Sequence, residues 1–459
     1  MEAIQLVLIM SILLLVLVFL GLRVAFAAAF VGLLGLTLHF AIIKDKGLVD
    51  GLIRAVSIAG LTPHSKLASR ELALIPTFVV IGFLAYYAGL TKALFEACKR
   101  WLGWLPGGLG LSTLFATAGF AAVSGASLAT SAVFARIAIP DMLKLGYDKR
   151  FAAGVVAAGG TLASLIPPSA ILVVYAIITE TSVGKLLIAG FLPGFLSALI
   201  YAALIIGQAK LRPDLGPTVT GFTWAQRFES LPGTFPILFV VFAIIFSIST
   251  GWATPTEAGA VGAFVVLIVA LYQGMRWGQL REALMEAAKL SAMIFAMIWG
   301  VLIFVRFLGF AQVPAFLENW VLSIDQPALV ILLVILGIYI VLGMFMDAIG
   351  MMILTLPFAF PIVMALNGGE DVSAAQSAFG MSGDHAALWF GILVVKMAEL
   401  CLITPPIGLN CFVVASVRPE LSVQDVFRGA SPFFIADVVT VIVLIAFPGI
   451  VLFLPNLLS

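Results

Sequence analysis

The chain has 459 residues, of which 63% are hydrophobic and only 10% carry a charge. A soluble globular domain carries about 25% charged residues, so this composition excludes an ordinary soluble protein. The net charge of +1 gives no case for nucleic-acid binding. The three cysteines, Cys98, Cys401 and Cys411, lack metal-ligand spacing and are interpreted as small core residues.

Long apolar runs follow one another along the chain. About 18 such residues are enough to cross a bilayer as a helix, so the sequence predicts an all-α polytopic membrane protein with about ten transmembrane helices. These lie at roughly 3–22, 24–43, 75–91, 151–179, 186–208, 233–250, 257–274, 290–310, 386–417 and 431–456. No lysine or arginine precedes Arg23, so the first run is expected to be a retained membrane helix rather than a cleaved signal peptide.

Two further apolar stretches, 108–140 and 328–366, are each long enough to enter the membrane and return as a re-entrant hairpin. The centre of the first is rich in small and polar residues, and the second carries Asp347. With hairpins at both places, most loop lysines and arginines fall on one side, which the positive-inside rule makes cytoplasmic and which leaves the N-terminus outside. Two full crossings in each stretch would preserve the same bias, so both alternatives stay open.

Proline pairs interrupt two of the predicted spans, at Pro167–Pro168 and Pro405–Pro406. Proline cannot donate a helix hydrogen bond and its ring clashes with the preceding turn, so each span is expected to break there. Free carbonyls at membrane depth are tolerated only where protein or a water-filled cavity covers them. Two such broken helices in corresponding places indicate the binding site of a secondary transporter.

The order of hairpin, broken helix and closing helix occurs twice and predicts two inverted repeats. Pro168 and Pro406 are separated by the same number of residues as the flanking Leu162 and Leu400. The predicted organisation is N-terminal scaffold helices with an outside interfacial segment at 1–74, a first repeat at 75–208, a cytoplasmic linker at 209–232 and a second repeat at 233–459.

Candidate ion-binding residues gather at the hairpin centres and the breaks. Hydroxyls and free carbonyls suit a hard cation, and half-helix N-termini favour the carboxylate of an anion. The candidates are Ser124, Gly125, Ser127, Thr130, Gly159, Gly160, Thr161 and Ser164 in the first half, and Asp347, Gly350, Glu399, Thr404 and Asn410 in the second. For any single serine or threonine, helix packing is the simpler explanation, and only the clustering argues for a site.

Several charged residues lie inside apolar runs. A carboxylate at mid-depth costs about 2.5 kcal/mol or more, so Asp347 is interpreted as an ion ligand, with a structural pair as the alternative. Lys396 and Glu399 share one helix face and are interpreted as a structural pair. Arg136 and Arg306 are expected to reach the interface or to pair structurally.

The sequence gives little support for an enzymatic function. The chain has three histidines, none of them near the serine cluster, and it has no phosphate-binding loop. Ser124 follows Ala-Val rather than the Gly-x of rhomboid-like proteases. An intramembrane hydrolase that uses Ser124 or Asp347 is kept as an unfavoured alternative.

Taken together, these motifs resemble the large membrane subunit of TRAP transporters, the DctM-like family. The resemblance runs from about Arg23 to the C-terminus and rests on Ser124-Gly-Ala-Ser-Leu-Ala-Thr130, Pro140-Asp-Met142, Gly159-Gly-Thr161, Pro167-Pro-Ser169, Ala253-Thr-Pro-Thr-Glu-Ala258 and the segment from Glu399 to Asn410. Ala126 replaces a serine that is frequent in the family, Cys401 replaces a usual glycine, and the polar stretch 367–385 looks longer than usual.

The resemblance implies a sodium-coupled importer of organic anions, such as C4-dicarboxylates or sugar acids, that works by an elevator mechanism in a bacterial inner membrane. It implies a small DctQ-like membrane subunit and a periplasmic, DctP-like substrate-binding protein as partners. Sodium would be the coupling ion, with no other metal and no cofactor. The alternative is a self-sufficient anion symporter of the same superfamily.

Carried onto this chain, the resemblance implies two sodium sites and one substrate site. The first sodium site would use Ser124, Gly125, Ser127 and carbonyls around Gly160 and Ala163, and the second would use Asp347 and Thr404. Substrate would lie between the hairpin tips, near Ser164, Pro168, Ser169, Glu399 and Asn410.

Overall fold

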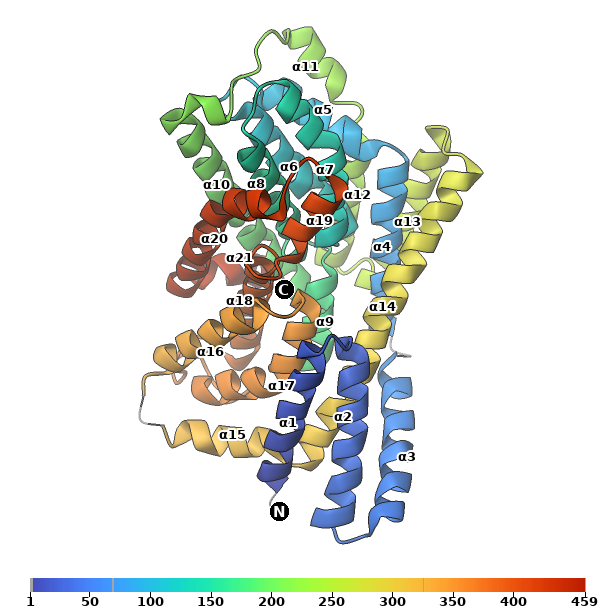
Figure 1. Cartoon of the computed structure of the whole chain (residues 1–459), viewed down its shortest axis with the longest axis vertical. Coiled ribbons are helices and arrows are strands. Elements are labelled where there is room, and N and C mark those ends of the chain that lie inside the picture. Colours follow the sequence, from blue (N-terminus) through green and yellow to red (C-terminus); the bar gives the residue numbers. More distant parts are fainter. Residues whose placement is uncertain (1–2, 68–69, 325, 459) are drawn as a thin grey trace.

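The computed structural model describes residues 3–67, 70–324 and 326–458, and these ranges contain helices and no strands (Figure 1). The predicted all-α class is therefore confirmed. Of the described helices, six are long and apolar enough to cross a membrane, and eight if two bent pairs are each counted as one span. The other predicted spans correspond to a shorter apolar helix at Ala3–Phe19 and to the two broken helices at 151–179 and 386–417.

The N-terminal part comprises α1 (Ala3–Phe19), α2 (Val24–Leu38), a π-helical turn (His39–Ile43), α3 (Leu48–Leu67), α4 (Leu74–Tyr87) and α5 (Leu90–Leu102). The chain bends by 67° between α4 and α5, where Gly89 adopts a left-handed φ of 79°. Helix α3 packs along α2 (Figure 1). Its expected location at the outside membrane interface stays a prediction.

Both stretches fold as helical hairpins, whereas their re-entry into the membrane stays a prediction, because Ala348–Asn367 alone is long and apolar enough to cross it. The first consists of α6 (Gly108–Ser124) and α7 (Ser127–Lys144), and the second of α16 (Ala328–Gly343) and α17 (Ala348–Asn367). In each hairpin the two helices pack against each other and are joined by a short tip. The tips are thus the residues between α6 and α7 and between α16 and α17.

Both proline pairs lie in true helix breaks. The first break separates α8 (Lys149–Thr161) and a 3-10 turn (Leu162–Ser164) from α9 (Ala170–Thr179). The second separates α18 (Gly383–Cys401) from α19 (Leu409–Val417). The Pro167–Pro168 and Pro405–Pro406 peptide bonds are both cis. Each break therefore leaves a non-helical stretch inside an otherwise apolar span.

The remaining elements close each half. They are α10 (Val183–Leu211), a 3-10 turn (Pro213–Leu215), α11 (Trp224–Ser230), α12 (Phe235–Ser249), α13 (Pro255–Tyr272), α14 (Trp277–Phe310), α15 (Val313–Leu322), α20 (Val423–Ala446) and α21 (Gly449–Leu458). Helix α14 starts well before the predicted residue 290. The prediction missed its first turns because they carry charged residues and do not form an apolar run. A hairpin, a broken helix and a long helix follow one another twice, whereas the domain boundaries and the inverted orientation stay predictions.

Small residues let two pairs of helices approach closely. A Cβ on Gly300 of α14 would lie 1.9 Å from the Ala25 carbonyl oxygen of α2, and one on Gly154 of α8 would lie 2.1 Å from the Gly429 carbonyl oxygen of α20. Such contacts replace the hydrophobic drive that is missing between helices in lipid. At one end of the second pair, Asp425 accepts from Lys149 Nζ at 2.7 Å and from Arg150 Nε at 3.1 Å.

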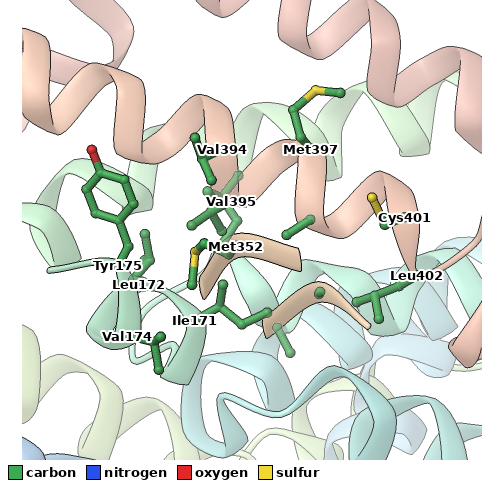
Figure 2. Close-up of a cluster of buried hydrophobic side chains, with 14 of the residues drawn as sticks. Ile171, Leu172, Val174, Tyr175, Met352, Val394, Val395, Met397, Cys401 and Leu402 are labelled. Carbon is green, nitrogen blue, oxygen red and sulfur yellow. The ribbon is translucent and has the colours of Figure 1, made fainter. Parts of the chain in front are cut away.

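Side chains from both halves meet in the core. Figure 2 shows Leu172 and Tyr175 of α9 beside Met352 of α17 and Val395 of α18. The Tyr175 hydroxyl also donates to the Ala387 carbonyl at 2.8 Å. The first break is therefore positioned by the second half of the chain as well as by its own.

Candidate transport site

The first hairpin tip is bonded directly to the first break. The amide of Ala170 donates to the Gly125 carbonyl at 3.4 Å, and the Ser127 and Ser164 hydroxyls lie 2.6 Å apart. Ser124 Oγ lies 3.0 Å from Thr130 Oγ1. These four hydroxyls are buried. The structure thus brings together the hydroxyls that the sequence placed at separate points of the chain.

Gly125 makes this close approach possible. It ends α6 with a left-handed φ of 58°, and a Cβ there would lie 2.4 Å from the Pro168 carbonyl oxygen. A side chain would therefore meet backbone that cannot move aside easily. Both the backbone conformation and the packing require glycine at this position.

The rest of the first group surrounds this contact. Ser169 caps α9, accepts from the Leu172 amide at 3.4 Å and donates to the Ser164 carbonyl. Ala163 and Gly160 are buried beside the break, and a Cβ on Gly160 would collide with the Ser131 hydroxyl. Hydroxyls and backbone carbonyls thus converge where a hard cation could replace its water ligands.

The second tip meets the second break in the same way. The Ile407 amide donates to the Met344 carbonyl at 3.4 Å. Asp347 caps α17 by accepting from the Gly350 amide at 2.9 Å, and the Thr404 hydroxyl donates to the Leu400 carbonyl at 2.6 Å. Within the described chain Asp347 and Thr404 share no hydrogen bond, so their joint sodium site stays a prediction.

Cys401 changes the packing at the second tip. A Cβ on Gly343 would lie 1.5 Å from Cys401 Sγ, so the thiol occupies the space beside this glycine. The thiol also lies 3.6 Å from the Tyr339 carbonyl oxygen. Cys401, which replaces a usual glycine, therefore packs against α16 and not against the break itself.

Asn410 connects the second break to the first half. Its side-chain amide donates to the Ala157 carbonyl of α8 at 3.1 Å, and its Oδ1 is buried without a hydrogen-bond partner among the described residues. An acceptor left free in this way is available to a ligand. This observation supports its predicted place near the substrate.

Glu399 belongs to a buried ionic cluster. Lys396 Nζ lies 2.6 Å from Glu399 Oε2 and 2.6 Å from Asp437 Oδ1, and the Tyr201 hydroxyl donates to the same Asp437 oxygen at 2.6 Å. All four side chains are fully buried. The predicted Lys396–Glu399 pair is confirmed. Glu399 Oε1 is buried without a hydrogen-bond partner among the described residues, so its predicted contact with substrate stays a prediction.

The sequence reading missed Asp437 and Tyr201. Asp437 lies in the predicted span 431–456, and a carboxylate inside a membrane span requires a partner. That signal was available, but nothing in the sequence indicates that the partner is Lys396. The cluster joins α10, α18 and α20 around the second break.

A cavity of about 480 Å³ lies beside the first tip. It is lined by residues of α4, α6 and α7, including Ser124, and by Arg136 and Glu286. Arg136 makes no ion pair with any residue that the structure describes. Its expected structural pairing is therefore not found in that part of the chain, and its side chain faces the cavity.

No group of three or more histidine, cysteine, aspartate or glutamate side chains that could hold a metal occurs within residues 3–67, 70–324 and 326–458. A cation at these tips would therefore depend on hydroxyls, backbone carbonyls and single carboxylates. Oxygen donors of this kind suit hard cations rather than soft ones.

Residues 10–450 match the family described as the tripartite ATP-independent periplasmic transporter, DctM component. The chain belongs to this family. The C4-dicarboxylate TRAP transporter large permease protein DctM of Pseudomonas aeruginosa is 35% identical over 390 residues, which are 84% of this chain and 86% of that protein. The sialic acid TRAP transporter permease protein SiaT of Haemophilus influenzae is 30% identical over 394 residues, 85% of this chain and 61% of that protein.

A solved structure has the same overall fold. The YdaH transporter of Alcanivorax borkumensis superposes with a TM-score of 0.57, over 87% of this chain and 89% of that one, at 13% sequence identity. At this identity the likeness concerns the fold alone. The DctM family assignment makes the chain a multi-pass membrane permease of a TRAP transporter.

Alanine at Gly125 tests the contact between the first tip and the first break. We expect Gly125→Ala to lower the free energy of unfolding by about 1–2 kcal/mol for the left-handed backbone and by a further 1–3 kcal/mol or so for the collision with Pro168. Gly146→Ala is the matched control, because Gly146 also has a left-handed φ but has open space around it. Equal losses in thermal unfolding of the purified protein would contradict the packing.

Proposed function

We propose that the chain is the transport subunit of a sodium-coupled importer of organic anions. The observation that carries the proposal is the pairing of each hairpin tip with its own helix break, Gly125 with Ala170 and Met344 with Ile407. Each pairing surrounds non-helical backbone with hydroxyls, carbonyls or a carboxylate at membrane depth. Such an arrangement can bind small ions and an anion between the tips.

The two halves offer different ligands to a cation. The first site would use Ser124, Gly125, Ser127 and the carbonyls near Gly160 and Ala163, whereas the second would use Asp347 and Thr404. Sodium bound at both places would fix the tips against the breaks. The anion would then be held near Ser164, Ser169 and Asn410, where the free Asn410 oxygen is located.

The packing of the elements supports transport by an elevator movement. The two broken helices are tied to each other through Asn410 and Tyr175, and each hairpin tip is bonded to its own break. We propose that they move as one body against α1–α4 and α12–α14, in an inner membrane with the N-terminus in the periplasm. The substrate class is organic anions, which includes the C4-dicarboxylates and sialic acid named for the two relatives.

The tripartite family description supports two partners, a small DctQ-like membrane subunit and a periplasmic DctP-like binding protein. Reconstitution of the three proteins in liposomes tests this proposal, with radiolabelled succinate and N-acetylneuraminate as probes. We expect uptake of at least one probe when an inward sodium gradient and the binding protein are both present. Uptake that persists without the binding protein would identify a self-sufficient symporter, and uptake that ignores sodium would contradict the coupling.

A further inference from the structure

The cavity beside the first tip lies between α4 and the hairpin. At one end, α4 backs directly onto the tip, because a Cβ on Gly82 would lie 2.6 Å from the Ser124 Cα. From there the lining continues along α4 to Tyr86 and Tyr87 and along α7 to Arg136. The cavity of about 480 Å³ thus extends from the tip toward the loop that joins α7 to α8.

One face of α7 lines this cavity. Leu128, Ala129, Ala132 and Val133 lie on the same helix face as Arg136, and all five line the cavity. At 1.5 Å per residue, Arg136 lies roughly 13 Å along α7 from Ser127. An anion that leaves the tip on this side would therefore pass apolar side chains before it meets the guanidinium.

The charges that line the cavity are unequally paired. Glu286 of α14 is the carboxylate in the lining, and it forms an exposed ion pair with Lys289 Nζ at 3.1 Å. Arg136 has no carboxylate within 4.0 Å in the parts of the chain that the structure describes, and its side chain is exposed to the cavity. An arginine is always charged at neutral pH. The lining therefore contains a guanidinium that has no ion-pair partner among the described residues.

We propose that Arg136 binds the carboxylate or other oxyanion of a small organic anion in this cavity, on the route between the first tip and the cytoplasm. This inference rests on the proposed transport function and names the residue that attracts the substrate on its inner side. A guanidinium can hold a carboxylate through two parallel hydrogen bonds. The apolar lining strengthens the attraction relative to open water, and the absence of a fixed carboxylate partner leaves the guanidinium free to release its ligand.

Charged thiol reagents can test whether the cavity prefers anions, and they do not require that the substrate be known. Ala132→Cys places a thiol about one helical turn from Arg136, in a background with Cys98→Ala to remove the partly exposed native thiol. The reaction rates of anionic MTSES and cationic MTSET are then compared in inside-out membrane vesicles that contain the assembled transporter. We expect MTSES to react faster relative to MTSET than it does with a free thiol in solution.

Arg136→Gln should lower that MTSES-to-MTSET ratio about tenfold, because a nearby partly screened charge is removed. Arg136→Lys should keep most of it. Lys144→Gln is the matched control, since it removes the same charge from an exposed position of α7 outside the cavity, and it should leave the ratio unchanged.

Three outcomes would overturn the inference. The ratio could be the same with and without Arg136. The thiol could react only from the periplasmic side in right-side-out vesicles. Both reagents could be excluded alike, as a bound lipid headgroup would cause. None of these readings requires transport, so failure of the liposome uptake experiment with wild-type protein would overturn the proposed function and not the anion preference of the cavity.

Discussion

Replacing Lys396 with methionine is expected to lower the free energy of unfolding by about 3–5 kcal/mol, because it leaves two buried carboxylates without their shared cation. Lys396 Nζ lies 2.6 Å from both Glu399 Oε2 and Asp437 Oδ1, and none of the three side chains is exposed. The measurement is equilibrium denaturation of the purified protein. Lys185→Met serves as the control, because Lys185 is an exposed lysine of α10.

The same cluster provides its own rescue. Combining Lys396→Met with Glu399→Gln and Asp437→Asn removes every charge from the group and should restore most of the lost stability. Asparagine at 437 can still accept from the Tyr201 hydroxyl. A triple variant less stable than Lys396→Met alone, or a single variant that costs under about 1 kcal/mol, would show that the ionic cluster does not hold α10, α18 and α20 together.

Replacing Ser127 with alanine is expected to raise the sodium concentration for half-maximal uptake about tenfold, which corresponds to about 1.4 kcal/mol. Hydrogen bonds and ligand contacts to charged groups are typically worth this much or somewhat more. The Ser127 hydroxyl lies 2.6 Å from that of Ser164, where the first tip meets the first break. The assay is uptake in proteoliposomes at varied sodium and constant ionic strength.

Ser197→Ala is the matched control for that experiment. Ser197 is also buried, but its hydroxyl donates to the Pro193 carbonyl within α10 at 3.0 Å and not to a residue of either tip. Its removal should leave the sodium dependence unchanged. A shift of equal size in the two variants would mean that Ser127 acts through helix packing, which is the simpler explanation for any single buried serine.

Elements that follow from local chemistry could be predicted from the sequence. Apolar runs of sufficient length predicted the helices, and the cyclic side chains of Pro167–Pro168 and Pro405–Pro406 predicted the breaks. The start of α14 could not be predicted in this way. Its first turns contain Glu286 and other charged residues, so they lack the apolar run by which the other helices were recognised.

The sequence indicated which polar residues lie at the tips and breaks, but not which of them contact one another. The Ser127–Ser164 contact joins positions that only the return of a hairpin brings together. Lys396 and Glu399 are separated by three positions on one helix, so their pair could be predicted, whereas Asp437 and Tyr201 come from helices whose facing sides no local pattern specifies. Likewise, only the packing of α4 and α14 beside α7 shows that Arg136 lines a cavity and has no ion-pair partner among the described residues.

The proposed function requires two chemically different sodium sites, one at each pairing of a tip with a break. They can be tested by radiometric binding of ²²Na⁺ to the purified complex in wild type, Ser127→Ala, Asp347→Ala and the double variant. We expect saturable binding to the wild type, partial loss in each single variant and loss of both components in the double variant. Absence of saturable binding to the wild type, or unchanged binding in both single variants, would contradict this proposal.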